Sequence, residues 1–306
     1  MKHEPVLFNE VVELLRPATE TGVVVDATVG LGGHAEGLLE RYEAVTVLGI
    51  DRDPRALEQA SRRLARYGPR AVLVQGRHEA IIDILEAKQI QLIDGLLADL
   101  GVSSMQLDDP ERGFSFRFDS ALDMRMGEGG ATAADLINTL PEAEIGRILH
   151  DFGEEPMARR IAHAIVVARE ESPIATTGRL SAVIRSVKRG GREKIDPSTL
   201  TFQALRIAVN QELVGLESFL RQAIGILRPG ARIGVIAFHS LEDRIVKGVF
   251  RSLTGQCSCP PGLPICVCGA EPTVRLVRSR AIEASEEEVD RNPRSRSARL
   301  RVAERV

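Results

Sequence analysis

Residues 23–34, VVVDATVGLGGH, contain a short apolar run, a carboxylate and three glycines. An apolar run that ends in Asp26 and meets a glycine-rich turn is typical of the first strand and ligand loop of an open α/β sheet. Glycine permits a tight turn and lets a ligand approach the backbone, because it has no side chain. This stretch therefore predicts a strand, a ligand-binding loop and a helix from about Ala35 to Tyr42.

Three more apolar runs follow, separated by helical patterns, and two of them also end in a carboxylate, Asp51 or Asp99. Apolar strands that alternate with helices pack as a parallel sheet with helices on both faces. The predicted fold class is therefore α/β, with a doubly covered, Rossmann-like sheet. The three runs cover residues 45–51, 71–74 and 93–99.

The pattern changes in the middle of the chain. Residues 107–197 show helical spacing of Leu, Ile and Ala with few strand signals. A helix expected over 202–227 and a strand expected over 232–238 then restore the α/β pattern. We therefore expect two domains, with the helical one inserted in the other, which suits a chain of 306 residues. The expected ranges are 1–106 with 198–306 for the α/β domain and 107–197 for the insertion.

Composition and charge are those of an ordinary globular protein. Hydrophobic residues make up 43% of the chain and charged residues 27%, enough for a sizeable core. The 40 basic and 43 acidic residues give a formal net charge of −3, so the whole chain lacks the basic excess of many nucleic-acid-binding domains. No signal peptide is evident and no apolar stretch reaches the ~18 residues of a membrane span, so the expected location is the cytoplasm, without a membrane partner.

The glycine loop suits one of two cofactor classes better. A nicotinamide dinucleotide places its pyrophosphate at a helix N-terminus, usually through Gly-x-Gly-x-x-Gly. The loop here reads Gly-x-Gly-Gly-His, which favours S-adenosylmethionine, a cofactor without phosphate that needs backbone room and polar partners. Asp51 ends the second strand, where a carboxylate accepts hydrogen bonds from ribose hydroxyls. Asp26, Asp51 and Asp99 are expected along one sheet edge, although helix capping is an alternative role for Asp26 and Asp99.

Several long motifs lie along the rest of the chain, and together they resemble the RsmH (MraW) family. The resemblance runs nearly end to end. It implies an S-adenosylmethionine-dependent methyltransferase, with a helical insertion, that methylates the N4 amino group of one cytidine in small-subunit (16S) ribosomal RNA. The motifs are HEPVL at 3–7, DLGVSS at 99–104, QLD at 106–108, RGFSF at 112–116, LDMRM at 122–126, FHSLEDR at 238–244 and NPRSRSA at 292–298.

The same resemblance implies a set of cofactor-binding residues. One of them, His78, stands where relatives are expected to carry Phe, and an imidazole can also stack on a base. Another, His34, is on its own an ordinary polar residue for the first turn of a helix. The set comprises Gly32, Gly33 and His34 at the methionine end of the cofactor, Asp51 at its ribose, His78 near its adenine, and Asp99 and Gln106 farther along the pocket.

Methyl transfer to an amino group requires the nitrogen in line with the sulfonium methyl. The N4 lone pair of cytosine is delocalised into the ring, so an acceptor for its hydrogens assists the reaction. Asp99 ends the fourth strand, where many amino-methyltransferases carry such an acceptor, and it is the predicted catalytic residue. His239 and Ser240, after the next strand, either assist in the same cleft or cap a strand end. Phe114 and Phe116 either stack on the flipped base or pack the insertion against the sheet.

Two stretches of the chain carry local positive charge. Residues 179–194 have a net charge of +5, and residues 275–305 have nine arginines and a net charge of +3. Such runs are usually solvated helix faces, but two of them beside a methyl-transfer site favour contacts with phosphates. The expected partner is small-subunit ribosomal RNA or the small subunit itself. DNA or transfer RNA as substrate, and a ribosome-assembly factor without turnover, remain the alternatives.

The four cysteines form two Cys-x-Cys pairs in one short segment. Four thiolates so close together are able to hold a structural zinc ion in tetrahedral geometry. Reduced thiols or redox-active disulfides are the alternatives, because the spacing differs from the common Cys-x2-Cys knuckle. The residues are Cys257, Cys259, Cys266 and Cys268.

Overall fold

The chain forms two compact units in the computed structural model. The sheet unit comprises Met1–Gly101 and Val214–Val306, and the helical unit comprises Val102–Leu213, a range that includes the predicted insertion. Each unit has its own hydrophobic core. The structure describes residues 4–101, 112–116, 118–127, 129–188, 196–255 and 271–306.

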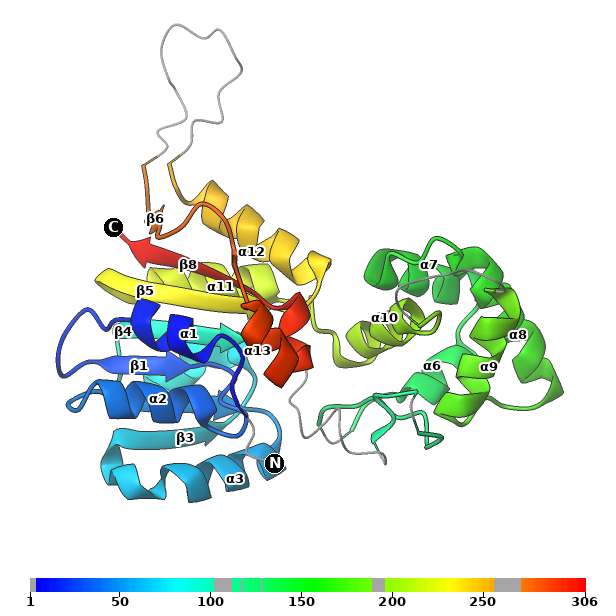
Figure 1. Ribbon diagram of the computed structural model, residues 1–306, viewed down its shortest axis with the longest axis horizontal. Helices are drawn as coiled ribbons and strands as arrows, with labels where there is room; N and C mark the ends of the chain where they lie inside the picture. The colour runs from blue at the N-terminus through cyan, green and yellow to red at the C-terminus, as the bar shows by residue number, and fades with distance from the viewer. Residues whose placement is uncertain (1–3, 102–111, 117, 128, 189–195, 256–270) are drawn as a thin grey trace, which may run out of the picture. The chain divides into compact units, whose positions relative to one another are not determined.

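An eight-stranded sheet lies at the centre of the sheet unit, with strand order β3-β2-β1-β4-β5-β8-β6 and β7 paired with β8 (Figure 1). The first five strands are parallel, as predicted, and β8 is antiparallel to β5 and to the two short strands beside it. The strands are β1 (Val23–Asp26), β2 (Thr46–Asp51), β3 (Ala71–Gln75), β4 (Ile93–Asp99), β5 (Leu227–Ala237), β6 (Val274–Leu276), β7 (Ile282–Glu283) and β8 (Arg299–Arg305).

Helices cover both faces of this sheet. Val24 and Val25 are consecutive in β1 and belong to different core clusters, because successive strand residues point to opposite faces. One cluster includes residues of α1 (Phe8–Leu14), α2 (Gly33–Arg41) and α3 (Pro54–Leu64). The other includes residues of α4 (Ile81–Ala87), α11 (Leu216–Gly225) and α12 (Ser240–Ser252). The remaining elements are α13 (Glu286–Arg291) and the 3-10 turns η1 (Ala65–Arg70), η2 (His78–Ala80) and η4 (Pro293–Ser297).

The single helix expected over 202–227 is wrong, because two helices occupy this range. The first, α10 (Thr199–Asn210), ends at Gln211, whose φ of +51° breaks the helical path, and belongs to the helical unit. The second, α11, begins after Gly215, which also has a positive φ, +78°. Helical spacing continues across the break, so hydrophobic periodicity alone did not reveal it.

The helical unit contains α6 (Ala133–Thr139), α7 (Glu142–Gly153), α8 (Ala158–Glu171), α9 (Thr177–Val187) and α10. Helix α7 packs closely on α10, since a Cβ at Gly153 would lie 2.7 Å from the Leu200 carbonyl oxygen. The Asn210 side chain receives the Met126 N–H at 2.8 Å and donates to the Met124 carbonyl at 2.7 Å, which ties the preceding loop to α10. Within the described residues, no helix of either unit combines the length and apolar character needed to cross a membrane.

Candidate functional site

Three carboxylates meet at one edge of the sheet, as predicted. Asp26, Asp51 and Asp99 end β1, β2 and β4, which are adjacent parallel strands with β1 between the other two. The carboxyl ends of parallel strands lie on the same edge, which is where α/β folds bind ligands. The glycine loop between β1 and α2 begins at this edge, so the glycines lie close to the acids.

Asp51 holds the glycine loop in place. Its Oδ2 accepts the Gly30 N–H at 2.9 Å, and its Oδ1 accepts the Asp53 N–H at 2.9 Å. Gly30 has a φ of +51°, and Gly32, the N-cap of α2, has a φ of +77°, so both occupy the conformation that favours glycine. Burial raises the pKa of Asp51. The two backbone hydrogen bonds act in the opposite direction but have a smaller effect. Each oxygen keeps a lone pair for a further donor, such as a hydroxyl group.

His34 lies in the first turn of α2 and is only 6% exposed. Its Nε2 is 2.9 Å from the Val6 carbonyl oxygen, so Nε2 must carry the proton because a carbonyl only accepts. Its Nδ1 lies 3.8 Å from Asp99 Oδ2. The Phe8 ring stacks on the imidazole, with centroids 6.4 Å apart. His34 is therefore a buried, oriented group and not a solvated polar residue.

Asp99 combines a buried oxygen with a raised pKa. Its backbone N–H donates to Thr28 Oγ1 at 2.6 Å, which anchors the end of β4. The side chain as a whole is 26% exposed, but Oδ1 is buried and has no hydrogen-bond partner within the described part of the chain. Burial raises the pKa of Asp99 well above its ordinary value, and the nearby charges of Asp26 and Glu242 act in the same direction. Such a group readily takes up a proton.

Asp26 is a second buried acid at this edge. It is 1% exposed, and its Oδ1 accepts the Thr28 N–H at 3.3 Å, two residues along the loop. Burial raises the pKa of Asp26 to about 7, opposed by that hydrogen bond and assisted by the charge of Asp51. The bond forms a local turn and does not cap a helix, so the capping alternative for Asp26 is wrong.

His78 follows β3, at the same edge as the three acids. Its ring makes an edge contact with Phe219, with centroids 4.7 Å apart. Burial lowers the pKa of His78, so the imidazole is neutral at pH 7. Its Nε2 is buried and, among the described residues, has no hydrogen-bond partner. A second unsatisfied polar atom therefore lies at this edge of the sheet.

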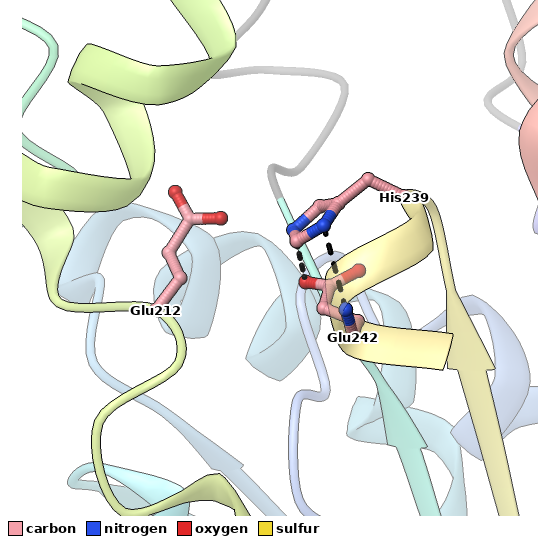
Figure 2. A group of neighbouring side chains, drawn as sticks. All are labelled: Glu212, His239 and Glu242. Atoms are coloured by element: carbon pink, nitrogen blue, oxygen red, sulfur yellow. Dashed lines mark hydrogen bonds and ion pairs between the residues drawn. The ribbon is translucent and has the colours of Figure 1, made fainter. Parts of the chain in front are cut away.

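His239 is the N-cap of helix α12, so it caps a helix start and not the strand end that was the expected alternative. Figure 2 shows its ring above Glu242: Nδ1 accepts the Glu242 N–H at 3.4 Å, and Nε2 lies 3.2 Å from Glu242 Oε1. Glu242 is 1% exposed, and its Oε2 accepts the Phe238 N–H at 2.9 Å. Ser240 is the first residue of α12. Sequence reasoning missed Glu242, whose position three residues after the cap was the available signal.

Phe114 and Phe116 pack in the core of the helical unit. Phe114 is 7% exposed, and the Phe116 ring makes an edge contact with Phe202 at 5.2 Å between centroids. Phe202 lies in α10, so these aromatic contacts join segments of one unit. The contacts pack Phe114 and the partly buried Phe116 within the helical unit, and stacking of either ring on a base stays a prediction.

The basic stretch 179–194 is mostly committed to internal contacts where the structure describes it. Arg179 donates to the Ala168 carbonyl at 3.0 Å, and Arg185 pairs with Asp196 at 2.8 Å. Lys188 forms a buried ion pair with Glu155 at 3.1 Å. These three side chains therefore have partners within the fold, and the phosphate footprint of this stretch stays a prediction. Arg189, Arg192 and Lys194 lie outside the described residues.

The second basic stretch, 275–305, is divided. Some of its arginines are paired, such as Arg301, whose guanidinium forms a bidentate contact with Asp243 at 2.6 and 3.0 Å. Burial acts to raise the pKa of Asp243, but the arginine contacts outweigh it and the pKa is lowered. Arg275 and Arg299 are paired with Glu304 and Asp243. Three arginines are exposed and have no polar side-chain partner in the described regions. They are Arg278, Arg280 and Arg296.

Several predicted site residues lie outside the described residues. Gln106, the last of the predicted cofactor contacts, is one of them. The possible zinc site is another, so the prediction about its ligands stays a prediction. Its four residues are Cys257, Cys259, Cys266 and Cys268.

Comparisons with known sequences agree on one family. The sequence profile of the MraW methylase family matches residues 1–306. The "Ribosomal RNA small subunit methyltransferase H" of Anaeromyxobacter dehalogenans is 48% identical over 307 residues, which cover 100% of this chain and 98% of the relative. The protein of that name from Granulibacter bethesdensis is 50% identical and covers 99% of this chain and 91% of its own. A solved rRNA methylase from Streptococcus thermophilus aligns with a TM-score of 0.41 and 12% identity, over 98% of this chain and 93% of that one.

These comparisons confirm the resemblance seen in the motifs, and with it an S-adenosylmethionine-dependent methyltransferase. The predicted α/β fold agrees with this assignment, because parallel strands and a glycine loop form the edge where such a cofactor binds. A full-length match by the family profile, joined by relatives at nearly half identity over the whole chain, establishes the relationship. The chain belongs to the MraW methylase family.

Proposed function

We propose that this protein transfers the methyl group of S-adenosylmethionine to the N4 amino nitrogen of one cytidine in small-subunit (16S) ribosomal RNA, in the cytoplasm. The names of the similar relatives support ribosomal RNA as the substrate. The observation that carries the amino-group chemistry is Asp99 Oδ1, a buried acceptor without a partner among the described residues. Its position at the end of β4 matches that of the orienting acid in amino-methyltransferases.

The residues at this edge fit the methyl donor. Gly32 supplies the left-handed backbone at the N-cap of α2, Gly33 lies against Pro5, and Asp51 retains acceptor capacity for ribose hydroxyls. His78 offers a neutral ring with an unsatisfied Nε2, which suits a contact with adenine. His34 and Asp99 lie farther along the same edge. When bound, S-adenosylmethionine supplies an electrophilic methyl group.

Asp99 has two roles in this proposal. Its Oδ1 accepts a hydrogen bond from the N4 amino group and turns the nitrogen toward the methyl carbon. As the new N–C bond forms and the S–C bond breaks, N4 loses a proton, and the Asp99 carboxylate takes it up. The raised pKa of Asp99 favours this uptake, and His34 Nδ1 lies 3.8 Å from Asp99 Oδ2 to share the proton afterwards.

The direct test supplies labelled S-adenosylmethionine with small ribosomal subunits, or with their RNA, and identifies the modified nucleoside by mass spectrometry. We expect labelled N4-methylcytidine at one position. Label in DNA or transfer RNA but not in ribosomal RNA would indicate the alternative substrates. Binding to small subunits without any transfer would indicate an assembly factor and contradict the proposed activity.

The RNA contact is proposed for η4, which lies at the carboxyl edge of the sheet. The register pairs Arg299 with Ala237, the last residue of β5, and η4 ends at Ser297, two residues before Arg299. Ser295 is fully buried and donates to the Asn292 carbonyl at 2.8 Å, so η4 is held in place. Arg296 next to it is exposed. An exposed cation at this edge suits a backbone phosphate of the bound RNA.

Arg296→Ala is expected to weaken RNA binding and to lower the salt dependence of the binding constant. Loss of one phosphate contact lowers the slope of log K against log salt by about 0.7 to 0.9. Filter binding at several salt concentrations measures this slope. Arg278→Ala is the matched control, since it removes the same charge from the β6–β7 connection. Equal effects of both substitutions would contradict a local contact at η4.

A further inference from the structure

The N-terminal residues 4–8, here called the strap, lie directly on the glycine loop and α2. A Cβ at Gly33 would come within 2.4 Å of Pro5 Cγ, so the strap and the loop are in close contact. Val6 supplies the carbonyl that receives the His34 Nε2–H, at 2.9 Å. The Phe8 ring stacks on the same imidazole, with an interplanar angle of 19°. The strap therefore determines how His34 is oriented.

The strap is itself held by the C-terminal part of the chain. Leu7 has a φ of +52°, a left-handed conformation that is unfavourable for a residue other than glycine. Its backbone N–H donates to Glu288 Oε1 at 2.8 Å in a buried hydrogen bond, across 281 positions of sequence. A second bond runs from Asn292 Nδ2 to the Glu4 carbonyl at 3.2 Å. These two anchors keep the strap in its unfavourable conformation.

Glu288 is placed differently from an ordinary helix-capping acid. It is the third residue of α13, where a glutamate commonly returns to the N-cap backbone to close a capping box. Ser285 does cap the helix by accepting the Glu288 N–H at 3.2 Å, but Glu288 Oε1 accepts from Leu7. Glu288 is 9% exposed, while its neighbours Glu286 and Glu287 are exposed. A buried carboxylate is thus used to bind the strap.

We propose that Glu288 is a positioning residue for the cofactor site: through Leu7 and Val6 it keeps the His34 imidazole in the Nε2-protonated tautomer, with Nδ1 facing Asp99. The chain of contacts is continuous and lies wholly within the sheet unit. Loss of the Glu288 acceptor leaves the Leu7 N–H without this hydrogen bond. The left-handed conformation of Leu7 is then no longer stabilised by it. The Val6 carbonyl moves with it. The inference rests on the proposed function, in which His34 lies at the methionine end of the cofactor.

Calorimetric binding of S-adenosylhomocysteine to the full chain tests this proposal. Glu288→Ala is expected to weaken binding about tenfold, the size expected for loss of one hydrogen bond to a charged group. Glu288→Gln is expected to stay within about threefold of the wild type, because its amide oxygen still accepts the Leu7 N–H. The matched control, Glu287→Ala, removes an exposed acid from the same turn and is expected to leave binding unchanged.

The ¹⁵N chemical shifts of the His34 ring provide a readout that a merely structural role would not move. We expect the Nε2–H tautomer in the wild type and a mixture of tautomers in Glu288→Ala. A lower melting temperature with unchanged affinity and an unchanged tautomer would overturn the inference, as would an equal loss of affinity in Glu287→Ala. If Glu288→Ala does not fold, Asn292→Ala tests the inference instead, because it removes the other anchor of the strap. About threefold weaker binding of S-adenosylhomocysteine is then expected. Unchanged binding overturns the inference.

The two proposals fail in different ways in this experiment. No binding of S-adenosylhomocysteine by the folded wild-type protein would contradict the proposed function. Binding by the wild type together with equal binding by Glu288→Ala would contradict only the role of Glu288. The strap contact itself is observed by hydrogen exchange at the Leu7 amide, which is expected to accelerate in Glu288→Ala and to stay slow in Glu287→Ala.

Discussion

Asp99→Ala is expected to lower kcat by about 10³-fold at saturating S-adenosylmethionine, since loss of one preorganised polar contact in an active site costs about 10²–10³. The substitution removes the buried Oδ1 that orients the amino group and accepts its proton. The backbone bond from the Asp99 N–H to Thr28 Oγ1 is retained, so the end of β4 should keep its position. Single-turnover methylation of ribosomal RNA measures the effect.

Two controls separate chemistry from binding in this variant. Calorimetric titration with S-adenosylhomocysteine shows how much of the effect comes from the cofactor, which we expect to account for only a small part. Asp99→Asn keeps an oxygen that orients the amino group but loses the ability to take up a proton, so an intermediate loss of kcat is expected. Asp99→Ala with kcat within tenfold of the wild type would reject the catalytic assignment.

The pH dependence of kcat follows from the same group. Burial raises the pKa of Asp99 well above that of an ordinary carboxyl, so the accepting carboxylate is lost as the pH falls through this raised pKa. We therefore expect kcat of the wild type to rise with pH over a range where an ordinary aspartate is already ionised. In Asp99→Asn this limb of the profile should disappear. A wild-type limb that survives in Asp99→Asn would assign it to another group.

Asp26→Asn is expected to stabilise the sheet unit at alkaline pH. Burial raises the pKa of Asp26 from 3.8 to about 7 in the folded chain, so the folded state holds a proton that the unfolded chain has released. The free energy of unfolding of the wild type therefore falls as the pH rises between these two values. The difference in free energy of unfolding between the variant and the wild type should therefore grow by about 3 kcal/mol from pH 5 to pH 8. This follows from 1.36 kcal/mol per unit over the roughly two units between pH 5 and the pKa of the folded state.

Urea unfolding followed by circular dichroism at the two pH values measures this difference. A change between pH values is informative even if the amide itself alters the baseline stability, because an asparagine does not titrate. Asp83→Asn is the control, since Asp83 is an exposed acid in α4 of the same unit. The change with pH for Asp26→Asn is compared with that of this control. The same gap for Asp26→Asn at pH 5 and pH 8 would show that the buried acid is not protonated near neutrality.

Much of the sheet edge was predictable from local sequence. The apolar runs that end in Asp26, Asp51 and Asp99 predict strands, and parallel strands must bring their carboxyl ends to one edge. The break between α10 and α11 was not predictable in the same way, because the helical spacing of apolar residues continues through it. The positive φ at Gln211 is a property of the folded backbone, and a glutamine in the sequence does not predict it.

The sequence by itself determined the family, the parallel character of the first strands and the position of the three acids, because each depends on motifs or on patterns within a few residues. Only the tertiary structure decided which charges are free. Lys188 belongs to a basic run, yet it is buried against Glu155, 33 positions away. Leu7 and Glu288 lie at opposite ends of the chain and meet beside the glycine loop. The partner of a side chain depends on which distant segments pack together in the folded core. Patterns within a few residues of sequence do not contain that information.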